Sequence, residues 1–167
     1  MRKILIVGVS NIVGGIETLF YGLFHKKSDA FDITFLSFDE ECAFSDVYKS
    51  NGYKVDVMPS RRKTPFTFSK NVKNYFKAHS DFDYVWVNTA STSMYQFQKY
   101  GKKYTKAKII THSHGTRFER SKNILFHLGN IVLDKINYKR VVSNTDLFFC
   151  CSKVAGVALF GKAKEKE

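Results

Sequence analysis

Apolar residues follow two patterns along this chain, short continuous runs and longer segments with helical spacing. Short runs rich in β-branched and aromatic residues are typical of strands buried on both faces of a sheet. Apolar residues three or four positions apart are typical of helices that pack one face on such a sheet. Strands are expected at about residues 4–7, 31–38, 53–58, 83–88, 107–112 and 146–151. Helices are expected at about 16–27, 41–50, 66–79, 94–104, 123–142 (with weak breaks at Gly129 and Asn137) and 153–160.

Strands that alternate with helices form βαβ units, so the pattern predicts an α/β fold with a parallel, doubly wound, Rossmann-like sheet. One domain is expected over residues 1–161, and residues 162–167 are expected to form a polar tail. We expect the strand order 3-2-1-4-5-6. In such sheets ligands bind beyond the carboxyl ends of the strands, at the switch point between strands 1 and 4.

A glycine-containing loop follows the first strand and leads into the first helix. Gly14 and Gly15 lie where the chain turns, and glycine allows the backbone to approach a ligand closely. The free N–H groups and the positive dipole end of a helix N-terminus favour a phosphate or a carboxylate. Two interpretations follow: an anion-binding loop, or a tight strand-to-helix turn that needs glycine only for its geometry.

Two further loops with chemically active side chains are expected at the same edge of the sheet. The fourth strand is followed by a hydroxyl-rich loop at 89–93, which contains Ser91, and the fifth strand ends in His112 and His114. A histidine with a near-neutral pKa can hydrogen-bond a developing oxyanion or a sugar hydroxyl, or transfer a proton. Residues two apart on a strand point the same way, so the two histidines are also a candidate metal pair, although no cysteine or carboxylate lies close in sequence. The remaining alternative is that one ring caps local backbone.

The net charge of +12, from 27 Lys and Arg against 15 Asp and Glu, favours polyanionic partners: nucleic acid, an anionic membrane surface or phosphorylated substrates. The densest cluster is Arg61, Arg62 and Lys63, between the two prolines of the chain. A basic amphipathic helix follows it, and cations beside aromatic residues suit an anionic membrane or an acidic acceptor. The alternatives are a solvated basic face and a helix that only packs on the sheet. No nucleic-acid-binding motif accompanies the charge, so nucleic acid is not an expected partner.

The three cysteines form neither a zinc-binding spacing nor a disulfide framework. Cys150 and Cys151 lie in an apolar run, which predicts a buried strand. The apolar run at the amino terminus is short and opens directly into the glycine loop, unlike a signal peptide. No apolar stretch is long enough to span a bilayer. These features predict a cytoplasmic protein that can also bind peripherally to the inner face of the membrane.

A dinucleotide-binding domain is one functional alternative. Its fingerprint, G-x-G-x-x-G with an acidic residue about twenty positions later, is incomplete here, because the first loop contains only Gly8, Gly14 and Gly15. Asp39 lies near the position from which a carboxylate would contact the ribose. A non-catalytic basic interaction module and a subunit of a split enzyme are further alternatives.

Three segments together resemble a known family: Val-Gly-Gly-Ile-Glu at 13–17, His-Ser-His-Gly-Thr at 112–116 and Cys-Ser-Lys-Val-Ala-Gly-Val-Ala-Leu-Phe-Gly at 151–161. In order and spacing they are similar to the amino-terminal half of the retaining, GT-B-fold glycosyltransferases of family 4. The resemblance implies an acceptor-side domain in which the glycine loop approaches the donor phosphates and His114, in an H-G pattern, reaches the transferring sugar. Asn88 departs from the pattern, because many relatives have histidine after the fourth strand.

The resemblance also implies a second, donor-binding domain, whose paired glutamates hold the donor nucleotide and sugar and which is expected to be absent from this chain. We therefore expect the acceptor-side half of a hexosyltransferase that moves a sugar from a nucleotide-sugar to a polysaccharide or lipid-linked acceptor, inactive by itself. No metal is implied, and no cofactor beyond the nucleotide-sugar co-substrate. The implied site residues are His114, with His112 as second candidate, for catalysis; Gly14 and Gly15 for the donor phosphates; and Arg61, Arg62, Lys63 and Ser91 for the acceptor or the membrane.

Overall fold

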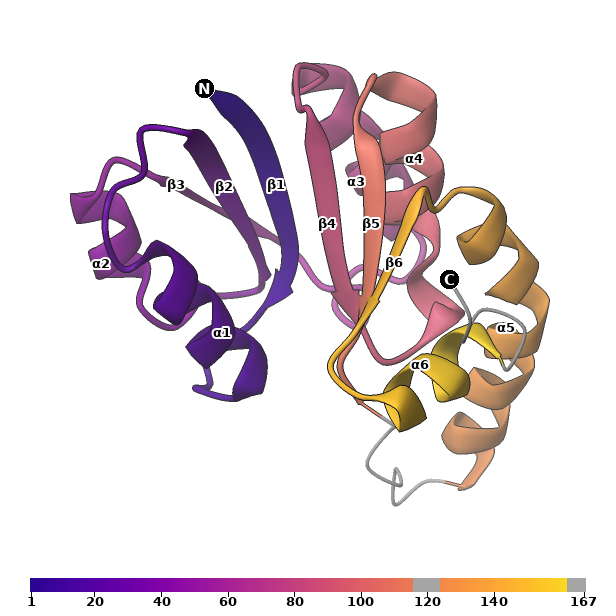
Figure 1. The fold of residues 1–167 in the computed structure, drawn as a ribbon. Coiled ribbons are helices and arrows are strands. Elements are labelled where there is room, and N and C mark those ends of the chain that lie inside the picture. The colour runs from indigo at the N-terminus through magenta and orange to yellow at the C-terminus, as the bar shows by residue number, and fades with distance from the viewer. Residues whose placement is uncertain (116–123, 162–167) are drawn as a thin grey trace.

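Six parallel strands form a single sheet in the order β3-β2-β1-β4-β5-β6 (Figure 1). The computed structural model describes residues 1–115 and 124–161, so the predicted polar tail at 162–167 lies outside the described residues. The strands are β1 Arg2–Val9, β2 Phe31–Phe38, β3 Lys54–Met58, β4 Tyr84–Thr89, β5 Lys108–Ser113 and β6 Leu147–Cys150. Both the predicted single-domain α/β class and the predicted strand order are confirmed.

Helices cover the sheet on both faces (Figure 1). They are α1 Gly15–Phe24, α2 Ser45–Ser50, α3 Phe68–Ala78, the 3-10 turn η1 Thr92–Met94, α4 Gln96–Tyr104, α5 Ile124–Ser143 and α6 Lys153–Phe160. The first two helices cover β1 to β3 on one face, while α3 and α4 pack on each other against the opposite face. The long α5 contacts η1 and α4, and the short α6 contacts β5 and β6.

The two faces of β1 belong to two separate hydrophobic cores. Ile4 and Ile6 join an aromatic core under α1 and α2, in which Phe35 stacks on Tyr48 with ring centroids 3.9 Å apart. Leu5 lies in the second core, under α3 and α4. Both cores need apolar side chains from the same strand, and this explains why the strand has a continuous apolar run instead of an alternating one.

Some helix boundaries differ from the prediction because tertiary contacts decide them. The predicted helix at 41–50 begins only at Ser45, since Phe44 takes a left-handed conformation with φ 64° and Ala43 donates its N–H to the carbonyl of Ser10. Conversely, α5 runs through Gly129 and Asn137 without a break. Asn137 is buried inside this helix, where its side chain accepts a hydrogen bond from Arg140.

The prediction that Cys150 and Cys151 lie in a buried strand is wrong. The strand exists but ends at Cys150, Cys151 follows it, and both residues are exposed. β6 is the last strand in the sheet, and the described part of the chain places no strand on its outer side. An apolar run at a sheet edge therefore remains partly in contact with solvent, as Leu147 and Phe149 also do, with 39% and 41% of their surface exposed.

Candidate functional site

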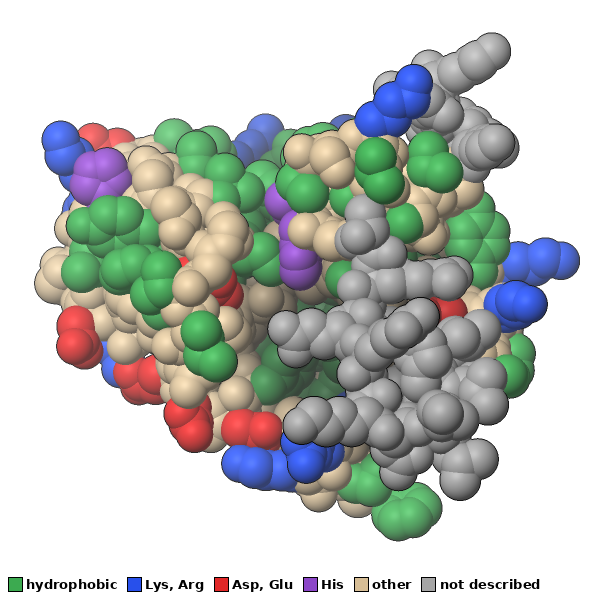
Figure 2. Space-filling model, turned by 90° about the horizontal axis from the view of Figure 1, so that it is seen from below, with side chains coloured by type: hydrophobic (Ala, Val, Ile, Leu, Met, Phe, Trp, Pro, Cys, Tyr) green, Lys and Arg blue, Asp and Glu red, His purple; other side chains and the backbone are tan. Residues whose placement is uncertain are grey.

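A pocket of about 440 Å³ opens at the carboxyl ends of β1 and β5. Figure 2 looks onto this edge and shows histidine side chains in the hollow at its centre. A depression is therefore present at the edge of the sheet where the ligand site is expected. Its walls include Ser10, Gly15 and Glu17 from the β1–α1 segment, His112 and His114 from the end of β5, and Cys151 after β6.

Gly8 allows the ends of β1 and β4 to come together beneath this pocket. Its φ is +89°, and a Cβ there would lie 2.5 Å from the carbonyl oxygen of Asn88. A left-handed conformation and a contact this short both exclude a side chain. The glycine that matters for the close approach is thus the one at the end of the strand, ahead of the Gly14-Gly15 pair.

The carboxylate of Glu17 fills the β1–α1 loop. It is 5% exposed and accepts hydrogen bonds from the Ser10 N–H at 2.8 Å, the Ser10 hydroxyl at 2.9 Å and the Gly14 N–H at 3.0 Å. Those two amides are therefore not available to an external anion. Gly15, which begins α1, has open space where a side chain would be. A bound anion would have to approach the helix from the Gly15 side.

Glu17 is not among the site residues that we expect from the sequence. A detectable signal exists, because a carboxylate three positions after a helix N-cap is the second half of a capping box. Gly14 occupies the N-cap position, where Ser or Thr is usual, and this hides the motif.

His112 is held in one orientation by Asn88. The amide Nδ2 of Asn88 donates to the carbonyl of Val7 at 2.9 Å, so its Oδ1 is the atom that lies 3.0 Å from His112 Nδ1 and accepts from it. The proton of the neutral ring is thereby placed on Nδ1, which leaves Nε2 as an acceptor. Burial, together with the nearby His114, lowers the pKa of His112.

His114 lies beside it, with the two ring centroids 6.2 Å apart. Burial lowers the pKa of His114, and the negative charge of Glu17 opposes that shift only in part. Both rings are therefore neutral near neutral pH. Two neutral imidazoles in a pocket can accept or donate hydrogen bonds to hydroxyl groups without adding a charge. The Thr116 end of this predicted loop lies outside the described residues.

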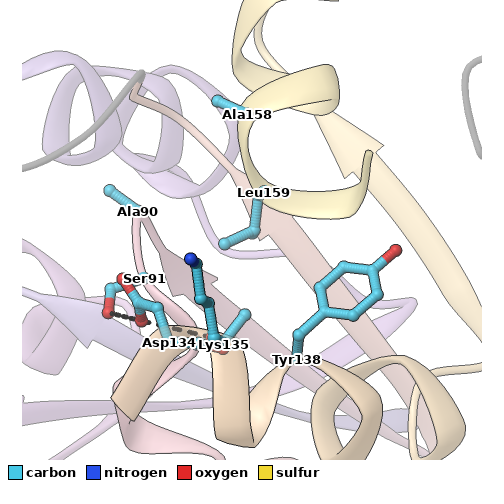
Figure 3. Close-up of a pocket in the computed structure, with 8 residues that line it drawn as sticks. Ala90, Ser91, Asp134, Lys135, Tyr138, Ala158 and Leu159 are labelled. Carbon is cyan, nitrogen blue, oxygen red and sulfur yellow. Dashed lines mark hydrogen bonds between the residues drawn. The ribbon is translucent and has the colours of Figure 1, made fainter. Parts of the chain in front are cut away.

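Ser91 does not share this pocket. It lines a second one, of about 240 Å³, between η1, α5 and α6 (Figure 3). Its hydroxyl donates to Asp134 Oδ1 at 2.6 Å, and the hydroxyl of Thr92 donates to the Asp134 carbonyl at 2.7 Å. These bonds hold the hydroxyl-rich loop against α5. The Lys135 side chain extends from α5 into the same pocket, toward Leu159.

Two side chains of the basic loop make contacts within the fold. Arg61 donates from Nη1 to the carbonyl of Ser93 at 2.7 Å, and Lys63 forms an ion pair with Asp39 at 3.5 Å. Arg62 is exposed. Hydrogen bonding from Ser60, and secondarily the charge of Lys63, holds the pKa of the Asp39 carboxyl below its usual value. The carboxylate that could contact a ribose is therefore already engaged.

Two further observations bear on the chemistry of the site. No cluster of three or more His, Cys, Asp or Glu side chains in the described ranges could hold a metal ion. None of the helices in those ranges is long and apolar enough to cross a membrane.

The sequence matches no protein-family model and no curated relative. Solved structures are similar in fold. Anabaena Alr3699/HepE, in complex with UDP and glucose, aligns with a TM-score of 0.64 and 15% identity over 98% of this chain and 42% of its own. A Burkholderia multivorans protein assigned as a short-chain alcohol dehydrogenase aligns with a TM-score of 0.56 and 12% identity over 96% of this chain and 88% of its own. At these identities the likeness shows the Rossmann-like fold alone, and the chain spans less than half the length of HepE.

Proposed function

We propose that this chain is the acceptor-side domain of a glycosyltransferase and contributes half of a nucleotide-sugar site at the carboxyl edge of its sheet. The observation that carries the proposal is the pocket in which Gly15 at a helix N-terminus faces the neutral His112 and His114. The fold similarity to a protein in complex with UDP and glucose supports it.

In this proposal each side of the pocket meets a different part of the donor. The N-terminus of α1 at Gly15 contacts the phosphates. His114 hydrogen-bonds the transferring sugar as charge develops, and His112, oriented by Asn88, supports it. Because Glu17 already uses the amides of Ser10 and Gly14, this half binds the donor phosphates weakly and depends on a second, donor-binding domain.

The acceptor binds on the other side of the histidines. The pocket that contains Ser91 and Lys135 offers the Lys135 ammonium and the acceptor positions that the Ser91–Asp134 hydrogen bond leaves on that hydroxyl and carboxylate, which suit a hydroxylated acceptor. The exposed Arg62 is available to an acidic or lipid-linked acceptor at a membrane surface, whereas Arg61 and Lys63 chiefly support the loop.

A dinucleotide-dependent oxidoreductase is the second candidate, favoured by the similarity to the alcohol dehydrogenase along most of that protein's length. Two observations weigh against it. The glycine fingerprint is incomplete, and the carboxylate of Asp39 is bound to Ser60 and Lys63.

Protection of Cys151 from alkylation distinguishes the glycosyltransferase from the oxidoreductase. Cys151 lines the pocket, Cys150 is exposed outside it, and Cys42 is buried, which raises the pKa of its thiol to about 11. We expect saturating UDP-sugar or GDP-sugar to slow alkylation of Cys151 by iodoacetamide and to leave Cys150 unchanged, as read by peptide mass spectrometry. Protection by NADH or NADPH and by no nucleotide-sugar would support the oxidoreductase, and equal rates at Cys151 with every nucleotide would exclude both.

A further inference from the structure

A third depression, of about 340 Å³, lies between α4 and α5. Its walls are formed by Lys99, Lys102, Lys103, Arg140 and Asn144, and among the described residues no carboxylate lines it. α4 ends just before β5 begins, and Asn144 just precedes β6. The groove therefore lies toward the amino-terminal ends of the strands, away from the histidine pocket, and it has no role in the function proposed above.

The two helices on one side of this groove are strongly basic. Together α3 and α4 carry six lysines and no acidic residue, and the two helices pack on each other. Lys102 and Lys103 lie in the last turn of α4, and Arg140 lies in the last turn of α5. The negative end of a helix dipole stabilises cations there, which explains part of the positive charge. Lys99 lies in the first half of α4, where the helix dipole does not stabilise a cation. Of the four cations in the groove wall, only Lys102 has a carboxylate partner within the described ranges, Asp146.

Two of these cations contact the same aromatic ring. Tyr95 has the ammonium of Lys99 at 5.8 Å from its ring centroid and the guanidinium of Arg140 at 4.9 Å. Arg140 is further oriented by the buried Asn137, whose Oδ1 accepts from Arg140 Nη1 at 3.0 Å. A guanidinium has five N–H donors, so most of them remain for another acceptor.

We propose that the α4–α5 groove binds a phosphoryl anion. A phosphoryl group carries more than one negative charge and several acceptor oxygens, so it can neutralise a lysine pair and engage a planar guanidinium at the same time. A single carboxylate cannot balance three unpaired cations. One soluble pyrophosphate offers several charges, and adjacent anionic phospholipids, each with one charge on its phosphodiester, offer them together; the test below separates these two sources.

The test compares two variants with equal net charge. The groove variant is K99Q/K103Q/R140Q, which keeps Lys102 because of its ion pair with Asp146. The control is K26Q/K27Q/K54Q, which removes three exposed cations from the part of the fold that contains α1 and β3. Thermal melting and circular dichroism establish that both variants are folded. Binding of inorganic pyrophosphate is measured by calorimetry, and binding to vesicles of equal parts phosphatidylcholine and phosphatidylglycerol is measured by flotation.

We expect the groove variant to lose affinity by roughly fivefold per removed charge, while the control variant stays close to wild type. Selective loss of pyrophosphate binding would identify a soluble phosphoryl ligand. Selective loss of vesicle binding, with no pyrophosphate binding by the wild type, would identify a lipid headgroup. Equal behaviour of the two variants with both probes would overturn the proposal, because net charge alone would then explain any binding. The cysteine-protection experiment measures binding in the histidine pocket, which is a different site from the groove. The proposed function and the proposed anion site can therefore fail independently.

Discussion

At the scale of single residues, the candidate site depends on one carboxylate and one amide. Glu17 stabilises the β1–α1 loop by satisfying donors that would otherwise face an anion, and Asn88 sets the tautomer of His112. Asn88 leaves His112 with a single acceptor nitrogen. Glu17 leaves the loop able to meet an anion only from the Gly15 side.

The two histidines make the stability of the protein depend on pH. Because burial lowers the pKa of His112 and His114 in the folded state, the unfolded chain takes up protons first as the pH falls through about 6.5. The free energy of unfolding should therefore be greatest above that pH and fall until the folded-state pKa values are reached. Urea unfolding at about pH 7.5 and about pH 5.5 measures the loss. His114→Gln should reduce it, and an unchanged loss in this variant would show that His114 does not contribute to the pH dependence.

At the scale of elements, the site is positioned by the close approach of β1 and β4. Their pairing is parallel, with Val7 opposite Val87, and it ends where Gly8 meets the backbone of Asn88. The hydroxyl-rich loop at 89–93 lies apart from the histidines because hydrogen bonds from its side chains to Asp134 attach it to α5. One pocket thus forms above β1 and β5, and a separate one forms beside α5 and α6.

Gly8→Ala should destabilise the protein by about 1–3 kcal/mol, since the added methyl group would meet the Asn88 carbonyl and the backbone there is left-handed. Gly22→Ala is the matched control. Gly22 lies within α1 with open space around it, so alanine there should leave stability unchanged or raise it by about 0.5–1 kcal/mol. Chemical denaturation of the three proteins provides the comparison. Equal stability of Gly8→Ala and wild type would mean that the two strand ends are not held together.

At the scale of the whole molecule, this chain provides one face of the proposed reaction site. The pocket is open, and its phosphate-facing side has few free donors. An enzyme that stabilises a charged transition state needs donors around the reacting atoms and exclusion of water, which one open face does not supply. The basic groove between α4 and α5 lies away from that face.

The 167-residue chain alone should show little or no sugar transfer with UDP- and GDP-sugars, and turnover should require a donor-binding domain, supplied in trans or by fusion. In that joined enzyme His114→Ala should lower turnover by roughly a hundred- to a thousandfold, the usual cost of one transition-state hydrogen bond. Product formation and melting temperature are measured together. Robust turnover by the isolated chain, or near-normal turnover by a folded His114→Ala enzyme, would contradict this assignment of roles.

Local periodicity was sufficient to predict the parallel sheet, its strand order and most helices, because strand and helix patterns differ over a few residues and right-handed crossovers leave few topologies. The expected start of α6 is confirmed as well, because Ser152 is its N-cap and its hydroxyl accepts from the Ala155 N–H at 3.1 Å. Contacts between distant segments decided the rest: the engagement of Asp39 by Ser60 and Lys63, the separation of Ser91 from the histidines, and the exposure of Cys150 and Cys151 at the sheet edge. A side chain's partners and its exposure depend on what tertiary packing brings beside it, and no pattern within one segment contains that information.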